Sequence, residues 1–231
     1  MPAGAPPSPA LFQPRLPLEA SVREEHDGLV VSDCNRAALE ALDGFPGAAQ
    51  RVLALIGPAG SGKSHLARVW ARRVGARTLD PATMAAGDQA PDHVPLVLEQ
   101  AESFEAEALF HLFNRAEIEQ QPLLLVSRTS PDQWLFALPD LRSRLLAVRM
   151  VRIREPDETV LEAMLVRAFA RRGILPPPDL IPYMLRRMER SGAAVSALVD
   201  QLYEAPGEVT RRSAARLLDH LCEEETADLF D

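Results

Sequence analysis

Residues 51–64 have the sequence RVLALIGPAGSGKS, an apolar run that leads into a glycine-rich loop. The run has the length and composition of a buried parallel strand. From position 57 to position 64 the loop matches the phosphate-binding pattern G-x-x-x-x-G-K-S in full. Residues 64–74 then carry apolar side chains at helical spacing, so the stretch predicts a strand, a phosphate-binding loop and a helix in that order.

Each part of this loop has a chemical purpose. Glycines let successive backbone N–H groups point at phosphate oxygens, and the following helix presents its positive N-terminal end to the same anion. Lys63 supplies a compact ammonium for the β- and γ-phosphates, and Ser64 supplies a hydroxyl for Mg²⁺. We therefore predict that this segment binds ADP or ATP with Mg²⁺. Its residues are Gly57, Pro58, Ala59, Gly60, Ser61, Gly62, Lys63, Ser64 and His65.

The placement of Lys63 supports a functional loop. It is the only lysine in a chain of 231 residues that has 25 basic residues in total, the others all being arginine. Random placement among the basic positions would put the lysine here roughly once in 25 trials. The alternative, a chance Gly/Ser loop before a helix, leaves that placement unexplained.

A second metal ligand is expected at the end of a neighbouring strand. The apolar run 94–98 is followed by Glu99, which we predict to hold Mg²⁺ directly or through water and to serve the chemistry at the phosphates. A solvated glutamate after a strand is the alternative. Gln100 follows and cannot ionise, so it cannot act as a general base, although it could orient a water. Glu102 is acidic but lies two residues late.

The remaining pattern predicts an α/β fold with a parallel sheet covered by helices on both faces. Strands are expected at 51–56, 78–79, 94–98, 123–126 and 150–153, and helices at 35–42, 64–74, 104–120 and 138–145, with a loop over 80–93. Ser32 or Asp33 is the expected cap of the first helix. Beyond position 156 the periodicity is helical throughout, near 157–172, 179–190, 195–204 and 208–222.

This change of pattern sets the expected domains. We predict a disordered N-terminal segment at 1–20, an α/β nucleotide-binding domain at 21–156 and an all-helical domain at 157–231, whose acidic end at 223–231 is expected to fray.

Composition excludes several classes of protein. An apolar fraction of 47% is ordinary for a globular chain, and no apolar run approaches the 18 or so residues of a membrane span. The N-terminus lacks the features of a secretory signal, and Cys34 and Cys222 form no spaced motif. We therefore expect a cytoplasmic protein with no membrane partner. A net charge of −8 argues against non-specific coating of nucleic acid.

Several segments resemble the AAA+ ATPases, specifically the group of DnaA-type replication initiators. Residues 29–38, which we name the leading segment, contain an Asn35-Arg36 pair similar to the one that lines the adenine side of the site in that group. Residues 138–145 (LPDLRSRL) resemble the family's box VII, so the resemblance implies that Arg144 is an arginine finger acting in trans. The helical patterns after position 156 resemble the family's lid.

Full initiators continue into a helix-turn-helix domain that reads DNA, and the printed chain has no segment left for one. We therefore expect no direct sequence-specific DNA binding. The shorter form is similar to the Hda group, the regulatory inactivators of the initiator. Residues 13–18 (QPRLPL) resemble the peptide with which that group binds the DNA polymerase sliding clamp. The resemblance implies contacts by Gln13, Leu16, Pro17 and Leu18.

The physics of this peptide is independent of the family. An extended, proline-stiffened segment loses little entropy on docking, and its leucines offer apolar anchors. The alternative is a leader whose Leu16 and Leu18 pack on the domain itself.

Three positions depart from the family pattern. Gln100 stands where a second acid is usual, and Arg128 stands where the sensor-1 stretch carries an aspartate. Ala193 takes the place of the sensor-2 arginine, with Arg190 one turn earlier. These changes affect groups that would position water and sense the γ-phosphate, so they count against ATP hydrolysis by the chain itself more than against nucleotide binding.

The leading hypothesis is a nucleotide-binding regulator of DNA replication initiation. It would dock on the sliding clamp and promote ATP hydrolysis by a DnaA-type initiator through Arg144, preventing re-initiation. An autonomous AAA+ ATPase of the helicase-loader type, a non-catalytic scaffold and a small-molecule P-loop kinase stay open as alternatives, as does a homo-oligomer. Arginines clustered between 140 and 190 form either a solvated surface or a basic face for a partner's nucleotide or clamp-loaded DNA.

Overall fold

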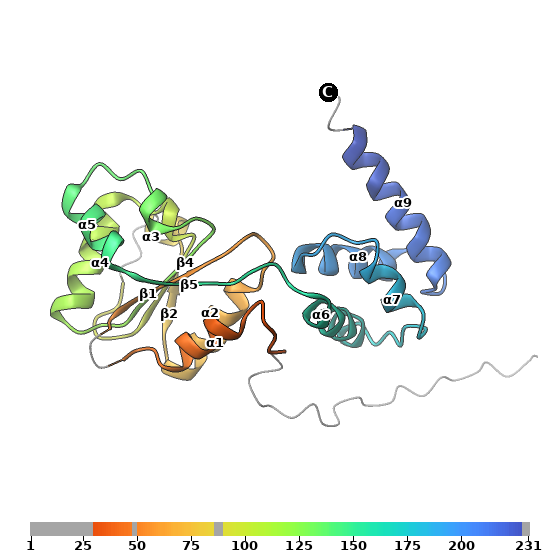
Figure 1. The fold of residues 1–231 in the computed structure, drawn as a ribbon, viewed down its shortest axis with the longest axis horizontal. Helices are drawn as coiled ribbons and strands as arrows, with labels where there is room; N and C mark the ends of the chain where they lie inside the picture. Colours follow the sequence, from red (N-terminus) through yellow and green to blue (C-terminus); the bar gives the residue numbers. More distant parts are fainter. Residues whose placement is uncertain (1–29, 48–49, 86–89, 228–231) are drawn as a thin grey trace, which may run out of the picture.

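The computed structural model describes residues 30–47, 50–85 and 90–227, so the expected clamp-binding peptide at 13–18 lies outside the described residues. The chain forms an α/β core and a group of helices that follows it (Figure 1). The core contains a five-stranded sheet in the order β2-β3-β4-β1-β5, and all neighbouring strands are parallel. The strands are β1 (Val52–Ile56), β2 (Arg77–Leu79), β3 (Leu96–Glu99), β4 (Leu123–Ser127) and β5 (Arg149–Arg152). The predicted parallel sheet is confirmed.

Both faces of the sheet are buried, because side chains alternate along each strand. On β1, Leu53 and Leu55 pack toward helices α1 (Arg36–Asp43) and α2 (Lys63–Val74). Ala54 and Ile56 point the other way, toward α4 (Ala106–Ile118) and α5 (Pro139–Ala147). Continuous apolar runs in the sequence are therefore the expected signature of these central strands.

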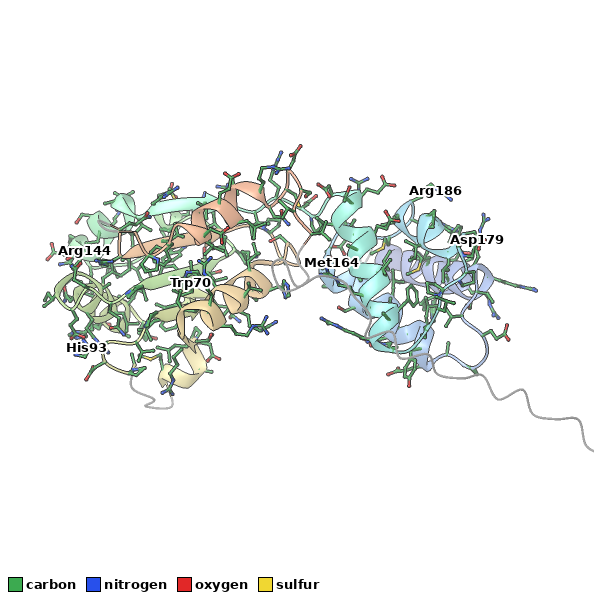
Figure 2. The ribbon with its side chains drawn as sticks, turned by 90° about the horizontal axis from the view of Figure 1, so that it is seen from below. Trp70, His93, Arg144, Met164, Asp179 and Arg186 are labelled. Atoms are coloured by element: carbon green, nitrogen blue, oxygen red, sulfur yellow. The ribbon has the colours of Figure 1, made fainter. Side chains whose placement is uncertain are left out.

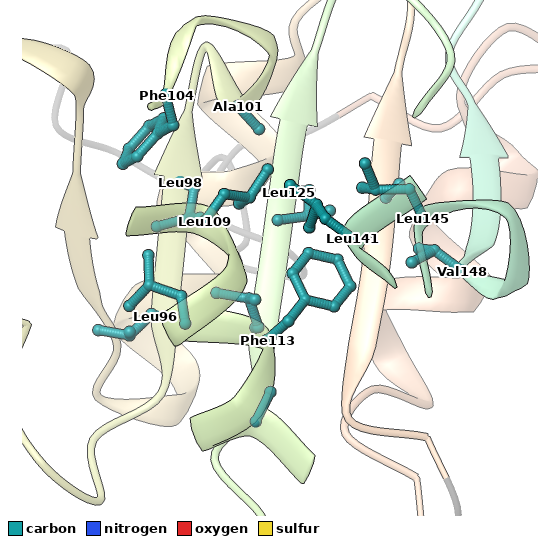
Figure 3. Close-up of a cluster of buried hydrophobic side chains, with 14 of the residues drawn as sticks. Leu96, Leu98, Ala101, Phe104, Leu109, Phe113, Leu125, Leu141, Leu145 and Val148 are labelled. Atoms are coloured by element: carbon teal, nitrogen blue, oxygen red, sulfur yellow. The ribbon is translucent and has the colours of Figure 1, made fainter. Parts of the chain in front are cut away.

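Large side chains fill the two layers. On the α4 and α5 side, Leu98 and Leu125 from the sheet meet Phe113 from α4 (Figure 3). On the other side, Trp70 is fully buried and its ring stacks on Phe45 with centroids 5.3 Å apart. The indole N–H of Trp70 donates to the carbonyl oxygen of Phe45 at 3.0 Å, so this buried polar group is satisfied.

The helices after β5 share a buried cluster of their own, separate from the two clusters of the core. They are α6 (Glu158–Arg171), α7 (Leu180–Leu185), α8 (Gly192–Glu204) and α9 (Arg211–Ala227). The side chain of Asp157 caps α6 by accepting from the N–H of Val160 at 3.0 Å, and Ser191 caps α8 by accepting from Ala194 at 3.1 Å. Such caps satisfy amides that would otherwise have no partner. Across the described ranges, none of the helices is both long and apolar enough to cross a membrane.

Several predicted boundaries were wrong. The expected loop at 80–93 contains a short helix, α3 (Pro81–Ala85), which begins at a proline that is tolerated in a first helical turn. The predicted helix at 179–190 is reduced to the six residues of α7. Helix α8 begins at Gly192 and not at 195, because Ser191 caps it.

Two further expectations at the ends of helices also need correction. The N-cap of α1 is Asn35 in place of Ser32 or Asp33, and the Asn35 amide is used to hold the preceding segment. Helix α9 continues to Ala227, well into the acidic segment that was expected to fray.

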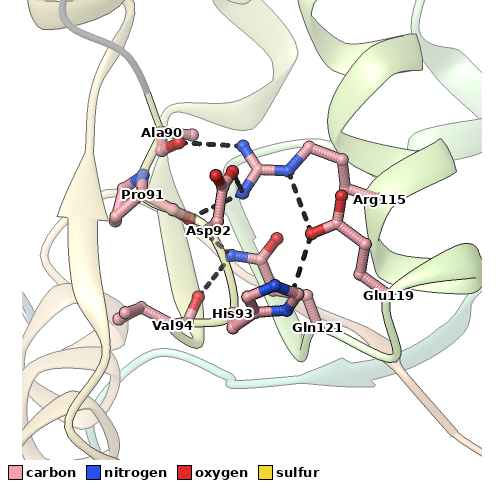
Figure 4. Close-up of polar contacts among 8 residues, drawn as sticks. All are labelled: Ala90, Pro91, Asp92, His93, Val94, Arg115, Glu119 and Gln121. Carbon is pink, nitrogen blue, oxygen red and sulfur yellow. Dashed lines mark hydrogen bonds and ion pairs between the residues drawn. The ribbon is translucent and has the colours of Figure 1, made fainter.

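A polar clamp positions the start of β3 (Figure 4). The guanidinium of Arg115, on α4, donates to the carbonyl oxygens of Ala90 at 2.8 Å and Pro91 at 2.7 Å, and pairs with Asp92 at 2.9 Å. The amide of Gln121 donates to the same Pro91 oxygen at 3.0 Å. These contacts tie the segment before β3 to the helix above the sheet, which makes the cluster structural.

Candidate functional site

The phosphate loop leaves β1 and bends in a way that requires glycine. Gly60 and Gly62 have φ values of 69° and 95°, in the left-handed region that favours glycine. Gly62 is also the N-cap of α2. At Gly57 a Cβ atom would lie 2.4 Å from the carbonyl oxygen of Ile153, so there the reason is a close approach of two backbones. The loop therefore has the curled form that turns backbone N–H groups toward an anion.

Lys63 lies buried within the loop that precedes it. Its ammonium donates to the carbonyl oxygen of Pro58 at 2.6 Å and lies 3.5 Å from the hydroxyl of Ser61. Burial lowers the pKa of Lys63, as does the charge of Arg128, while Glu102 and Glu99 act against both. An ammonium has three N–H donors, so one is left for a phosphate oxygen.

Ser64 and Glu99 come together although 35 residues separate them. The hydroxyl of Ser64, at the start of α2, donates to Oε2 of Glu99 at 3.0 Å. Burial raises the pKa of Glu99, and the hydrogen bond from Ser64 opposes that rise. A hydroxyl and a carboxylate are the hard oxygen ligands that Mg²⁺ takes beside phosphate oxygens and water, so the predicted pair fits this ion.

Glu102 joins the same cluster, which the sequence spacing did not predict. Gln100 adopts a left-handed conformation with φ 53°, and the 3₁₀ turn η1 (Ala101–Ser103) follows it. Oε1 of Glu102 accepts from the backbone N–H of Arg128 at 3.0 Å. Oε2 of Glu102 is buried and has no hydrogen-bond partner among the described residues. The charge of Glu102 acts on both Lys63 and Glu99. A buried oxygen of this kind is costly unless something binds it.

A cavity of about 640 Å³ opens beside the loop, which is an ordinary size for a small-molecule site. Four parts of the chain line it: the leading segment, the phosphate loop at Pro58, the connection from β5 to α6, and Arg190 just before α8. Asn35 shapes the leading segment, because its side chain accepts from the N–H of Ser32 and donates to the carbonyl oxygen of Val30, both at 2.9 Å. The backbone N–H of Arg154 then donates to the carbonyl oxygen of Cys34 at 3.0 Å and closes the wall.

The helical group touches the loop directly. The backbone N–H of Gly192, at the start of α8, donates to the carbonyl oxygen of Gly60 at 2.9 Å. Arg190, just before α8, lines the cavity together with Pro58. Ala193 is exposed and is absent from the cavity lining. Arg190, which the sequence places one turn before the expected sensor-2 position, is thus the arginine from the helical group that lines this cavity.

His65 follows Ser64 and is partly buried among arginines. Burial lowers the pKa of His65, and the positive charges of four arginines lower it further. In order of effect, these are Arg68, Arg167, Arg171 and Arg72. The positive surroundings therefore favour the neutral form of the imidazole.

Arg144 lies at the other end of the sheet (Figure 2). A second cavity of about 640 Å³ contains it, beside Val52 and Arg149 at the amino ends of β1 and β5. One guanidinium nitrogen donates to Glu117 at 2.8 Å, and the group lies 5.2 Å from the ring centre of Phe110. The phosphate loop follows the carboxyl end of β1, so Arg144 cannot serve the loop of its own chain.

The structure thus brings the loop residues 57–65 and Glu99 into one cluster and separates Arg144 from them. The sequence did not predict that two further residues, Glu102 and Arg190, lie beside the loop. Glu102 reaches the cluster through a left-handed turn at a non-glycine residue, for which the sequence carries no signal. Arg190 directly precedes the Ser191 cap, and that cap was the feature that could have located the start of α8.

No family model matches the chain. Its fold is similar to that of domain III of the replication initiation protein DnaA from Thermotoga maritima, with a TM-score of 0.71 and 17% identity over 84% of this chain and 95% of that one. AMPPCP-bound DnaA from Aquifex aeolicus gives 0.63 and 17% over 84% and 69%. A RuvB variant from Thermotoga maritima gives 0.61 and 18% over 81% and 68%.

Proposed function

Since the chain has the AAA+ fold of these proteins and an intact phosphate loop, we propose that it is a nucleotide-binding regulator of DNA replication initiation. It would bind ADP or ATP with Mg²⁺, dock on the DNA sliding clamp, and promote ATP hydrolysis by a DnaA-type initiator. In this respect it would act like the Hda group. Initiation would be limited in this way after the clamp is loaded.

Nucleotide binding is supported by the phosphate loop and by the cavity beside it. The ammonium of Lys63 has a donor to spare, and the curled loop presents backbone N–H groups. The neighbouring cavity has room for the base and sugar, and Arg190 supplies a cation from the helical group. Mg²⁺, held by Ser64 and Glu99, would neutralise charge on the phosphates.

The observation that carries the regulatory role is the position of Arg144. A guanidinium at the end of the sheet opposite the loop can act only on a nucleotide held by another molecule. Glu117 and Phe110 hold its charge near the surface, where the side chain is 28% exposed. Arginine fingers supplied in trans raise hydrolysis rates by about 10³–10⁵ in well-studied nucleotide hydrolases.

The decisive experiment measures ATP hydrolysis by the initiator with DNA-loaded clamp and this protein. Arg144→Ala should lower the stimulated rate by about a hundredfold or more, because transition-state charge loses its partner. Arg142→Ala is the matched control, since this exposed arginine lies on the same helix and its loss should leave the rate unchanged. Full stimulation by Arg144→Ala would reduce the protein to a non-catalytic scaffold and contradict the proposal.

Clamp docking is measured separately, through the peptide at 13–18. Gln13→Ala combined with Leu16→Ala should abolish binding to immobilised clamp in surface plasmon resonance. Arg15→Ala, within the same peptide, should keep it. Equal binding by all three proteins would remove the clamp from the proposal.

Glu102 favours a second candidate, an autonomous ATPase. Its unpaired buried oxygen lies among the groups that would surround the γ-phosphate, where it could accept a proton from water in place of the missing acid at Gln100. A basal ATPase rate that falls at least about tenfold in Glu102→Gln, and not in Glu105→Gln, would support this activity.

A further inference from the structure

The cavity at the amino ends of β1 and β5 holds more than the one arginine that the proposed function uses. Its volume is about 640 Å³, and three guanidinium groups line it together with a single carboxylate. The charged residues are Arg51, Arg144, Arg149 and Glu117, and Gln50 and Gln120 add two amides. We name this the amino-end cavity. An excess of positive over negative side chains in a concave site favours an anion.

Two of the three arginines are held by neutral oxygens. A guanidinium nitrogen of Arg149 donates to Oε1 of Gln50 at 3.2 Å. Nε of Arg51 donates to Oε1 of Gln120 at 2.7 Å, and another of its nitrogens donates to the carbonyl oxygen of Gly47 at 3.0 Å. An amide oxygen orients a guanidinium but carries no net charge, so these contacts do not cancel the positive charge of the cavity.

Gln120 connects Arg51 to the third arginine. Its Nε2 donates to the backbone carbonyl oxygen of Glu117 at 2.8 Å, and the carboxylate of Glu117 pairs with Arg144 at 2.8 Å. The side chains of the cavity are therefore fixed by one another before any ligand arrives. Donors that are already in place need no reorganisation when they meet a charged group, which makes them effective at stabilising it.

Arg149 is the arginine whose charge is least compensated. Among the described residues it makes no salt bridge, and it is exposed at the start of β5. By contrast, Arg73 of the same core pairs with Asp43 at 2.6 Å. A guanidinium has five N–H donors, and Gln50 accepts from only one nitrogen of Arg149. Most of its donors are therefore available to a ligand.

Phosphate groups are the anions that suit this arrangement. Guanidinium forks match phosphate oxygens, and a triphosphate carries several negative charges on neighbouring groups. Arg144 shares its charge with Glu117, so it neutralises such a chain incompletely by itself. A single carboxylate from a partner protein would need only one arginine and would leave the rest of the cavity's charge unmatched.

We infer that the amino-end cavity receives the terminal phosphates of a nucleotide held by a partner molecule, and that Arg149 contacts them as a second cation beside Arg144. The inference rests on the proposed function, which supplies the partner's ATP. The chain's own nucleotide cannot fill this cavity, because the phosphate loop follows the carboxyl end of β1. Figure 2 shows Arg144 at the end of the core that lies farthest from the helical group.

The test measures ATP hydrolysis by the initiator, with DNA-loaded clamp, over a range of concentrations of this protein. Arg149→Ala should lower the maximal stimulated rate by about tenfold or more, because charge in the transition state loses a fixed donor. Arg149→Lys should keep part of the rate, since it retains the charge, whereas Arg149→Gln should lose as much as Arg149→Ala. The last two variants also carry the test if Arg149→Ala does not fold.

The matched control is Arg142→Ala, which removes an exposed arginine of α5 that does not line the cavity and should keep the full rate. An unchanged maximal rate in Arg149→Ala overturns the inference. This includes the result in which only the concentration for half-maximal stimulation rises, because Arg149 would then touch the partner's protein surface and not its nucleotide. A full rate in Arg149→Gln overturns it as well, since a neutral side chain would then suffice.

A second measurement does not depend on the initiator. Inorganic tripolyphosphate without Mg²⁺ is titrated into Lys63→Ala, which lacks the lysine of the phosphate loop, and the heat of binding is recorded. We expect a dissociation constant of about 1 mM. Adding Arg149→Ala should weaken binding by about threefold, which corresponds to one exposed charge pair, and adding Arg142→Ala should not.

Tripolyphosphate binding that is absent, or that is the same with and without Arg149, overturns the phosphate site. Binding that depends on Arg149, without any stimulation of the initiator by the unaltered chain, supports the phosphate site and refutes the proposed function. The two failures are thereby distinguished.

Discussion

The pKa of the Glu99 carboxyl group is subject to opposing effects, of which burial and the hydrogen bond from Ser64 are the two largest. Burial disfavours the charged form and raises the pKa, and the hydrogen bond from Ser64 favours the charged form and lowers it; burial prevails. Mg²⁺ requires the ionised carboxylate. Because a raised pKa means that the proton is retained to higher pH, acidification should remove this ligand earlier than it would an ordinary glutamate.

We expect the affinity of Mg²⁺–ADP to rise with pH over the mildly acidic range. Glu99→Gln should abolish both the gain in ADP affinity from Mg²⁺ and the protein's part of its pH dependence. The measurement is titration with a fluorescent ADP analogue, with and without Mg²⁺, between about pH 5 and pH 8. Glu105→Gln is the control, because protonation of ADP itself is common to both proteins. Identical pH profiles for Glu99→Gln and the unaltered chain would exclude Glu99 as a ligand.

At the level of secondary structure, the apolar runs and the phosphate-loop pattern predicted β1, β4 and α2 closely. These elements are encoded by neighbouring residues, since buried strands need continuous apolar side chains and helices need them at 3.6-residue spacing. Helix α3, with five residues, is too short to show that period. Helix α7 ends at Leu185, although the apolar pattern continues as far as the buried Met188.

One contact between elements joins the helical group to the core. Gly60 has φ 69°, and a Cβ atom added there would lie 2.8 Å from the Cβ of Ser191 and 3.1 Å from the N of Gly192. The start of α8 therefore packs against the phosphate loop at a point where only glycine fits.

We expect Gly60→Ala to destabilise the protein more than Gly173→Ala does. Gly173 has a similar φ of 67° but open space around it, so its substitution costs only the backbone strain, about 1 kcal/mol. Gly60→Ala adds the clash with α8, about 1–3 kcal/mol more. Urea unfolding measures both losses. Equal losses would show that the contact between α8 and the loop contributes nothing to stability.

On the scale of the whole molecule, the cavity beside the phosphate loop is lined by residues of both the α/β core and the helical group. The leading segment and Pro58 come from the core, and Arg190 comes from the helical group. A ligand held by both parts binds only the folded chain, so it should raise the midpoint of thermal unfolding.

At a concentration of about 100 times its dissociation constant, ADP should add about 2.7 kcal/mol and raise the midpoint by about 5–10 °C. Lys63→Ala should lose most of this shift at the same ADP concentration, because the loss of a charged hydrogen bond weakens binding by about 1.5–3 kcal/mol. Arg186→Ala should keep it. Differential scanning fluorimetry measures the shift, and a full shift in Lys63→Ala would contradict the assigned role of the loop.

The amino-acid sequence by itself predicted the phosphate loop, the parallel sheet around it and the helices that follow. Each of these features depends on interactions between residues that are near one another in the chain. The sequence did not place Glu102 or Arg190 beside the loop, and it did not show that Glu117 holds Arg144 at the opposite end of the sheet. These placements follow from strand order and from the packing of distant segments, and such contacts leave no periodic signal in a single sequence.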